Sequence, residues 1–396
     1  MNPLFRTIPR HCRRWHAQSL RQQAQATAAV DIMLHPEAVP ANAQPAPAQP
    51  LVLDALPAEI LEMPATALYQ SLPGPCLIRL AGDDPRPLVV SVLQHGNEDS
   101  GWEAIRQLLK HRYQRQRLPR SLWLWIGNTQ AARWRRRRLP DQPDFNRCWP
   151  YPGRPPATEQ DRHEVGMFGQ LVEMLRAAQP LAVIDAHNNS GLNPHYSAIN
   201  RLDWRSYNLA RRFADIVVYF TSPPGTMANA CADFCPSLTL ECGQAGQVHG
   251  TDHAMRFIDD CLQLPAVDAA PRPLGEGVVY HMMATVYVSP GVQFGFQPES
   301  HPISFVANLD HHNFRHLPAG SKLADIAVAG ARCVLALDSH GHDITDDYFS
   351  FEHGELRTRR EIIPSMLTLD ERVISQDCLC YLMEVIDPFP QHAEPD

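Results

Sequence analysis

The stretch PLVVSVLQHGNE (87–98) decides the fold, because the buried strand predicted there is followed closely by His95 and Glu98, two residue types that can ligate metals. LAVIDAH (181–187) repeats the arrangement and ends in His187, while PSLTLEC (236–242) carries Glu241 near its end. Open α/β sheets bind ligands at the carboxyl ends of their parallel strands. The sequence therefore predicts that three strand ends converge on one catalytic site.

The surrounding chain has the same texture from about residue 51 to residue 265. Short apolar runs alternate with amphipathic stretches, a pattern typical of βαβ units. The predicted strands are 76–80, 87–94, 121–127, 181–187, 215–220 and 236–242, and the predicted helices are 102–114, 159–178, 204–214 and 252–262. We expect an α/β fold with a mixed, largely parallel sheet flanked by helices.

The two ends of the chain differ from this central part. Residues 1–50 are rich in Arg, Gln, Ala and Pro and end in PANAQPAPAQP, so we expect a disordered extension. Residues 266–272 have the composition of a linker, and the β-rich runs that follow predict a small C-terminal β domain over 273–390.

Charge and cysteine content exclude several classes of protein. The net charge is −8; the first 50 residues hold five Arg against Asp31 and Glu37, a net +3, which leaves −11 for the rest. An acidic body argues against nucleic-acid binding, and no apolar run is long enough to span a membrane. Ten cysteines without a disulfide-type spacing predict reduced thiols and a cytoplasmic protein. The sequence leaves a homo-oligomer open.

The ligand set points to zinc. Catalytic zinc takes three protein ligands and leaves a position for water, and His95, Glu98 and His187 supply a set of two histidines and one glutamate. We predict one Zn²⁺ per chain. Glu241 is the predicted general base, which takes a proton from the attacking water and delivers it to the leaving amine.

A second group of residues predicts an anion site. DFNR (144–147) places Asn146 beside Arg147. A planar guanidinium binds a carboxylate through two parallel hydrogen bonds, so Arg147, assisted by Asn146, is the expected anchor of a small anionic substrate. Five arginines between residues 133 and 138 precede this motif and are interpreted as a rim that attracts anions.

Taken in order, these motifs resemble the succinylglutamate desuccinylase and aspartoacylase family within the zinc metallocarboxypeptidase superfamily. The resemblance rests on HGNE (95–98), GNTQA (127–131), DFNR (144–147), DAH (185–187) and ECG (241–243). It implies a zinc carboxypeptidase-like catalytic domain over 51–265 and a deacylase that cleaves the amide of small, anionic N-acyl amino acids. It also implies zinc ligation by His95, Glu98 and His187, carboxylate binding by Asn146 and Arg147, and acid/base catalysis by Glu241.

The chain departs from the family pattern at one functional position. The family arginine that polarises the scissile carbonyl lies a fixed step before the DLNR motif, and Leu139 stands there in this chain. We assign its role to Arg138, one residue further away.

Two alternatives remain open on the sequence. A metallocarboxypeptidase acting on a peptide or a cell-wall fragment would use the same metal and the same anchoring arginine. The C-terminal β region decides between the two enzymes, since a region that caps the site admits only small substrates. The other alternative is a catalytically inactive zinc-binding homologue, which Leu139 favours. Asp185 is expected to orient His187, while His195 and Tyr196 are assigned either to the substrate or to packing.

Overall fold

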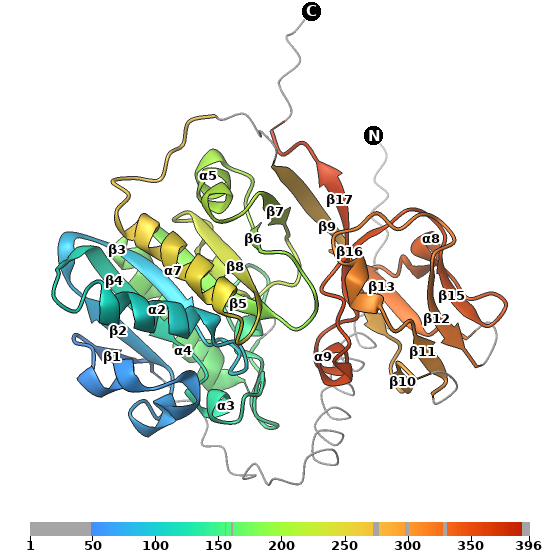
Figure 1. The fold of residues 1–396 in the computed structure, drawn as a ribbon, viewed down its shortest axis with the longest axis horizontal. Coiled ribbons are helices and arrows are strands. Elements are labelled where there is room, and N and C mark those ends of the chain that lie inside the picture. The colour runs from blue at the N-terminus through green and yellow to red at the C-terminus, as the bar shows by residue number, and fades with distance from the viewer. Residues whose placement is uncertain are drawn as a thin grey trace, which may run out of the picture.

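The computed structural model describes residues 49–389, except 155, 160, 272–276, 298–300 and 328–330. A twelve-stranded sheet runs through most of the molecule, and a five-stranded sheet lies beside one end of it (Figure 1). The predicted extension over 1–50 falls almost entirely outside the described residues. No described helix is long and apolar enough to cross a membrane.

The large sheet is parallel at its centre, where β3, β5 and β8 are neighbours. Its strands, in order across the sheet, are β1 (Leu51–Leu53), β2 (Cys76–Leu80), β4 (Leu118–Ile126), β3 (Gly82–Val92), β5 (Ala182–Asn189), β8 (Ser237–Gln244), β6 (Tyr196–Ile199), β7 (Ile216–Tyr219), β9 (Val278–Val288), β17 (Cys380–Ile386) and β16 (Ile363–Ser365), with β13 (Val334–Asp338) also paired to β9. The predicted α/β class is confirmed.

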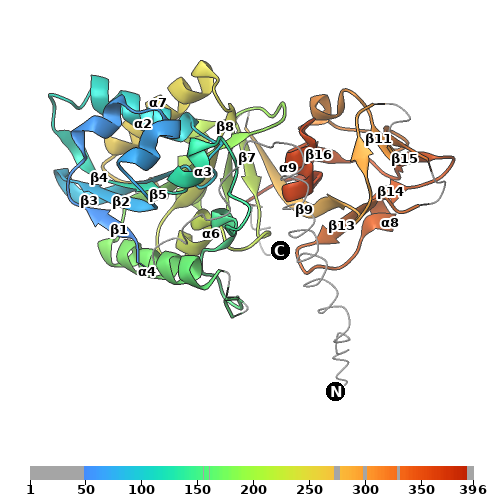
Figure 2. The same ribbon diagram turned by 90° about the horizontal axis from the view of Figure 1, so that it is seen from below.

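Helices cover both faces of this sheet (Figure 2). The longer ones are α2 (Ser100–His111), α4 (Arg162–Ala178), α5 (Trp204–Phe213) and α7 (Val248–Leu262), and the short ones are α3 (Thr129–Arg133), α6 (Met227–Cys231) and the 3-10 turns η1 (Ala58–Glu62), η2 (Ala65–Gln70) and η3 (Phe145–Arg147). One core packs α2, α5 and α7 on one face, and a second core packs α4 and α6 on the other. All four predicted helices are present.

The C-terminal region, residues 277–389, has a core of its own. Its small sheet contains β10 (Phe294–Gly295), β11 (Ile303–Phe305), β12 (Lys322–Ile326), β15 (Glu355–Thr358) and β14 (Phe349–Ser350), accompanied by η4 (Leu309–His312), α8 (Thr345–Tyr348) and α9 (Glu371–Gln376). The predicted β-rich texture is confirmed.

The boundary predicted at 266–272 does not interrupt the large sheet. Strand β9 lies parallel to β7 with Val279 opposite Val217, and both residues belong to the core beneath α5 and α7. Strand β17 then pairs with β9 along seven residue pairs. The C-terminal region is therefore joined to the catalytic sheet through backbone hydrogen bonds and shared apolar packing.

Candidate active site

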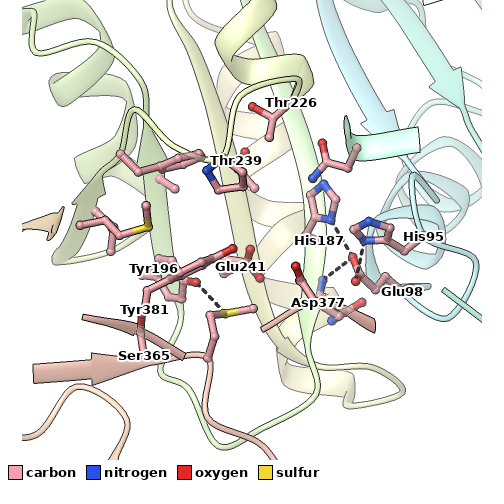
Figure 3. A pocket seen from close by; sticks show the side chains of 18 of the residues that line it. His95, Glu98, His187, Tyr196, Thr226, Thr239, Glu241, Ser365, Asp377 and Tyr381 are labelled. Carbon is pink, nitrogen blue, oxygen red and sulfur yellow. Dashed lines mark hydrogen bonds and ion pairs between the residues drawn. The ribbon is translucent and has the colours of Figure 1, made fainter. Parts of the chain in front are cut away.

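Three strand ends meet as the sequence predicted. His95 and Glu98 follow β3, while His187 and Glu241 lie on β5 and β8 and are direct partners in the register of these two strands. Since β3 and β8 flank β5, all four side chains reach the same edge of the sheet (Figure 3). They line one pocket with about 670 Å³ of empty space, counting its open mouth.

His95, Glu98 and His187 form a compact, buried cluster. One ligand atom from each lies within 4.8 Å of the others. Glu98 Oε1 is 2.8 Å from His95 Nδ1, and Glu98 Oε2 is 2.6 Å from His187 Nδ1. Among the described residues, this is the only group of three or more such side chains that could hold a metal ion.

The outer nitrogen of each histidine is held by another carboxylate. His95 Nε2 lies 3.1 Å from Asp144 Oδ1, and His187 Nε2 lies 3.0 Å from Asp185 Oδ2. Histidines that bind metals commonly donate their second ring N–H to a carboxylate, which fixes the tautomer and the ring orientation. The role predicted for Asp185 therefore matches its position.

The carboxylates and histidines of the cluster shift each other's pKa values. Burial disfavours the charged form of Glu98, but His95 and His187 outweigh it and hold the pKa of Glu98 well below its ordinary value. Burial likewise opposes charge on His187, yet Asp185 and Glu98 raise the pKa of His187 well above its ordinary value. Two histidines and a carboxylate fit a zinc ion in both ligand type and number.

Gly96 allows the HGNE turn (95–98) to form. The HGNE turn packs directly against α3, so a Cβ on Gly96 would lie 2.2 Å from the backbone nitrogen of Ala132. Asn128 begins α3 by accepting a hydrogen bond from Ala131 N, and it donates to Gln142 Oε1. The GNTQA motif is thus part of the support for His95 and Glu98 rather than a source of pocket side chains.

Glu241 lies beside the cluster with a free carboxylate oxygen. Its Oε2 atom is buried and has no hydrogen-bond partner in the part of the chain that the structure describes. Burial raises the pKa of Glu241 to about 8, and the nearby carboxylates Glu98 and Asp185 act in the same direction against the opposing charge of His187. A carboxyl group whose pKa lies near neutrality can both accept and return a proton.

Asp144 connects the DFNR motif to the cluster. It begins η3 by accepting a hydrogen bond from Asn146 N, and the same oxygen faces His95. Asn146 and Arg147 both line the pocket. Arg147 Nη1 donates to the carbonyl oxygen of Asn146, which holds the guanidinium at the wall of the pocket.

The structure brings Arg137, not Arg138, to the pocket. Arg138 is absent from the described lining residues, and its Nη1 donates to the carbonyl oxygen of Gln142. Arg137 donates to Asp144 Oδ2 through Nε at 3.1 Å and Nη2 at 2.9 Å, and its Nη1 lies 3.9 Å from Glu98 Oε1. A backbone hydrogen bond from Gly96 N to the carbonyl oxygen of Arg137 fixes this arrangement. Counting residues back from the DFNR motif could not show which arginine faces the pocket, because the chain between α3 and η3 is irregular.

Only part of the arginine run over 133–138 is therefore placed at the surface, as expected of a rim that attracts anions. Arg133 and Arg135 are exposed, and Arg133 stacks over Tyr69 and Trp134.

His195 and Tyr196, which the sequence assigned either to the substrate or to packing, lie in different places. Tyr196 lines the pocket and is opposite Glu241 in the register of β6 and β8. His195 stacks with His249 and His253 and is not among the described lining residues.

The C-terminal region supplies lining residues that the sequence did not identify: Met282, Ser365, Met366, Asp377 and Tyr381. Asp377 contacts both arginines, with Oδ2 3.4 Å from Arg137 Nη2 and Oδ1 3.2 Å from Arg147 Nη2. No spacing rule links this residue to the motifs, since it lies 230 positions from Arg147.

Comparison with known proteins agrees with this site. Residues 86–261, which contain all the predicted site residues, match the succinylglutamate desuccinylase/aspartoacylase catalytic domain. Over these 176 of its 396 residues, the chain is similar to this family. The family is one of deacylases, enzymes that hydrolyse amide bonds. No curated protein sequence matches the chain.

Several solved structures are similar to this chain at low sequence identity. The product-bound ectoine utilization protein EutE (DoeB) from Ruegeria pomeroyi is 15% identical, with a TM-score of 0.51 over 78% of this chain and 88% of that one. Succinylglutamate desuccinylase from Chromobacterium violaceum is 14% identical (TM-score 0.48, 77% and 86% covered). Murine aminoacylase 3 is also 14% identical (TM-score 0.48, 77% and 97% covered).

Proposed function

We propose that this protein is a zinc-dependent hydrolase that cleaves the amide bond of N-acyl amino acids. The observation that carries the proposal is the buried His95–Glu98–His187 cluster with the unpartnered carboxylate of Glu241 beside it, in a pocket that also holds two arginines. His95, Glu98 and His187 would hold one zinc ion. When bound, zinc acts as a Lewis acid that activates water and polarises the scissile carbonyl.

The chain's own residues account for the other steps. Arg147 and Asn146 bind the substrate carboxylate and orient the amide. Glu241 accepts the proton of the attacking water and then delivers it to the leaving nitrogen, and its position beside the metal cluster suits both transfers. Arg137 stabilises the charge that develops on the carbonyl oxygen, in place of the predicted Arg138, because its guanidinium lies at the pocket beside Glu98.

Two observations favour a deacylase over the two alternatives. Ser365, Met366, Asp377 and Tyr381 line the pocket from the C-terminal region, and Asp377 contacts both arginines, which supports a small substrate rather than a peptide. Arg137 lines the pocket and can supply the arginine that Leu139 does not provide, which counters the main argument for an inactive homologue.

The test combines metal content with release of primary amine. The purified full-length protein is analysed for zinc and assayed against N-acetyl and N-succinyl amino acids, with C-terminal dipeptides as the comparison. We expect about one zinc per chain and chelator-sensitive release from N-acyl amino acids. Preferred cleavage of the dipeptides would support the carboxypeptidase instead, and bound zinc without any turnover would support the inactive homologue.

A further inference from the structure

Asp377 occupies the place where the substrate's negative charge is expected. Its carboxylate lies between Arg137 and Arg147, the two arginines of the proposed site, and its side chain is only 18% exposed. Figure 3 shows it among the side chains that line the pocket.

The backbone holds Asp377 in this position from both sides. Its N–H donates to the carbonyl oxygen of Val373 and so closes α9, and Leu379 N donates to Val286 O, which starts the pairing of β17 with β9. The intervening Cys378 is buried. The backbone of Asp377 is therefore held in place, and its side chain is a permanent part of the pocket lining.

Carboxylates of the protein already neutralise much of the positive charge of the arginines in the pocket. Apart from histidines, the cationic side chains among its described lining residues are Arg137 and Arg147. Asp144 and Asp377 already engage Arg137, and Asp377 also engages Arg147. One incoming carboxylate can share Arg147 through its remaining donors. A second carboxylate would find no unshared arginine and would be repelled by Asp377.

Much of the remaining lining is apolar. Ala198, Val218, Phe220, Pro223, Met282 and Met366 line the same pocket. Ala198, Val218 and Met282 lie on β6, β7 and β9, which are adjacent strands on the side of β8 away from the metal cluster. A charged group placed against these side chains would lose water without gaining a partner, whereas an apolar group would be stabilised by burial.

We propose that the pocket selects N-acyl amino acids with a single carboxylate and an apolar side chain, and that Asp377 excludes those with a second carboxylate. The inference rests on the proposed function and names the substrate class of the same site. Asp377 is a specificity-determining residue that acts on the substrate's charge and through the two arginines.

The test compares substrates that share one acyl group. The zinc-loaded, full-length protein is assayed with N-acetyl-L-methionine and N-acetyl-L-leucine against N-acetyl-L-aspartate and N-acetyl-L-glutamate. We expect kcat/KM to favour the apolar pair by at least about 100-fold. In Asp377→Asn the preference should fall at least tenfold, because the dicarboxylates gain, while Asp377→Glu should keep it. The control is the same change at the exposed Asp387, which lies outside the described pocket lining.

The ratio of kcat/KM between two substrates does not depend on how much protein is folded, so a purely structural role of Asp377 would leave it unchanged. An equal increase in kcat/KM for all substrates in Asp377→Asn would overturn the inference, since Asp377 would then obstruct every substrate alike. Wild-type preference for the dicarboxylates would overturn it as well.

Failure of the proposed function gives a different result. If no N-acyl amino acid is hydrolysed, calorimetric binding of the same four compounds decides the selectivity. Binding of the apolar pair at least tenfold tighter, with the difference lost in Asp377→Asn, would support it. Equal binding, tighter binding of the dicarboxylates, or no binding of any compound would overturn it.

Discussion

The two sides of the pocket are built from different parts of the chain and in different ways. The metal side comes from three neighbouring parallel strands, β3, β5 and β8, and each functional residue follows or ends a buried strand. The opposite side comes from β6, β7 and the C-terminal strands β9, β16 and β17, joined by long connections.

The difference suggests a division of roles, with the proposed catalytic residues on one side and the residues proposed to select the substrate on the other. The side chains with the proposed metal-binding and proton-transfer roles lie on the metal side, where the sheet register fixes their relative positions. The C-terminal side contributes apolar surface and one carboxylate, Asp377, which reaches across to the arginines. Changes on the metal side should therefore abolish turnover, while changes on the C-terminal side should redirect it.

The largest effect is expected on removing the metal. His187→Ala removes one of three ligands, so the variant should lose zinc and all measurable turnover. Zinc content is measured together with amine release, and treatment of the wild type with a chelator should give the same loss. Readdition of zinc should restore the chelated wild type but not the variant. Full activity without zinc would contradict the assignment.

The next effect concerns Glu241. Glu241→Gln keeps the size of the side chain but cannot accept a proton, so we expect kcat to fall by about 10²–10⁴-fold. Zinc content should stay near that of the wild type, since Glu241 is not among the three ligands. A variant that lost its zinc as well would show that Glu241 acts mainly on the metal cluster.

Arg137 and Arg138 form a matched pair that tests the corrected assignment. Arg137→Lys should lower kcat by about 10²-fold, because a lysine cannot reproduce the two hydrogen bonds to Asp144 or the same position beside Glu98. Arg138→Lys should change kcat less than twofold. The reverse order of effects would restore the role first assigned to Arg138.

The smallest effect tests how the two regions are joined. Val279 is buried where β9 meets β7, so Val279→Ala should reduce the free energy of unfolding by about 2–3 kcal/mol. Because the sheet is continuous here, we expect one unfolding transition for both regions, followed by circular dichroism and tryptophan fluorescence. Two well-separated transitions would instead support the independent C-terminal domain predicted over 273–390.

Sequence patterns predicted most of the catalytic sheet, because local signals determine its parts. A buried parallel strand is a continuous apolar run, and β2, β3, β4, β5, β7 and β8 were all found in this way. The short β6 was missed, since Tyr196–Ile199 is too brief to show a period. The C-terminal strands were recognised as β structure, but their pairing with β7 was not, because strand pairing over a long connection leaves no local signal.

The sequence by itself determined which side chains gather at the pocket, because each follows a strand or lies in a compact motif whose neighbours along the chain fix its position. They are His95, Glu98, His187, Glu241, Asn146 and Arg147. Only the tertiary structure decided which arginine faces the pocket and that Asp377 joins it. Arg137 owes its place to Asp144 and to the turn at Gly96, and Asp377 owes its place to the pairing of β17 with β9. Such contacts depend on the packing of distant segments, which residue spacing does not encode.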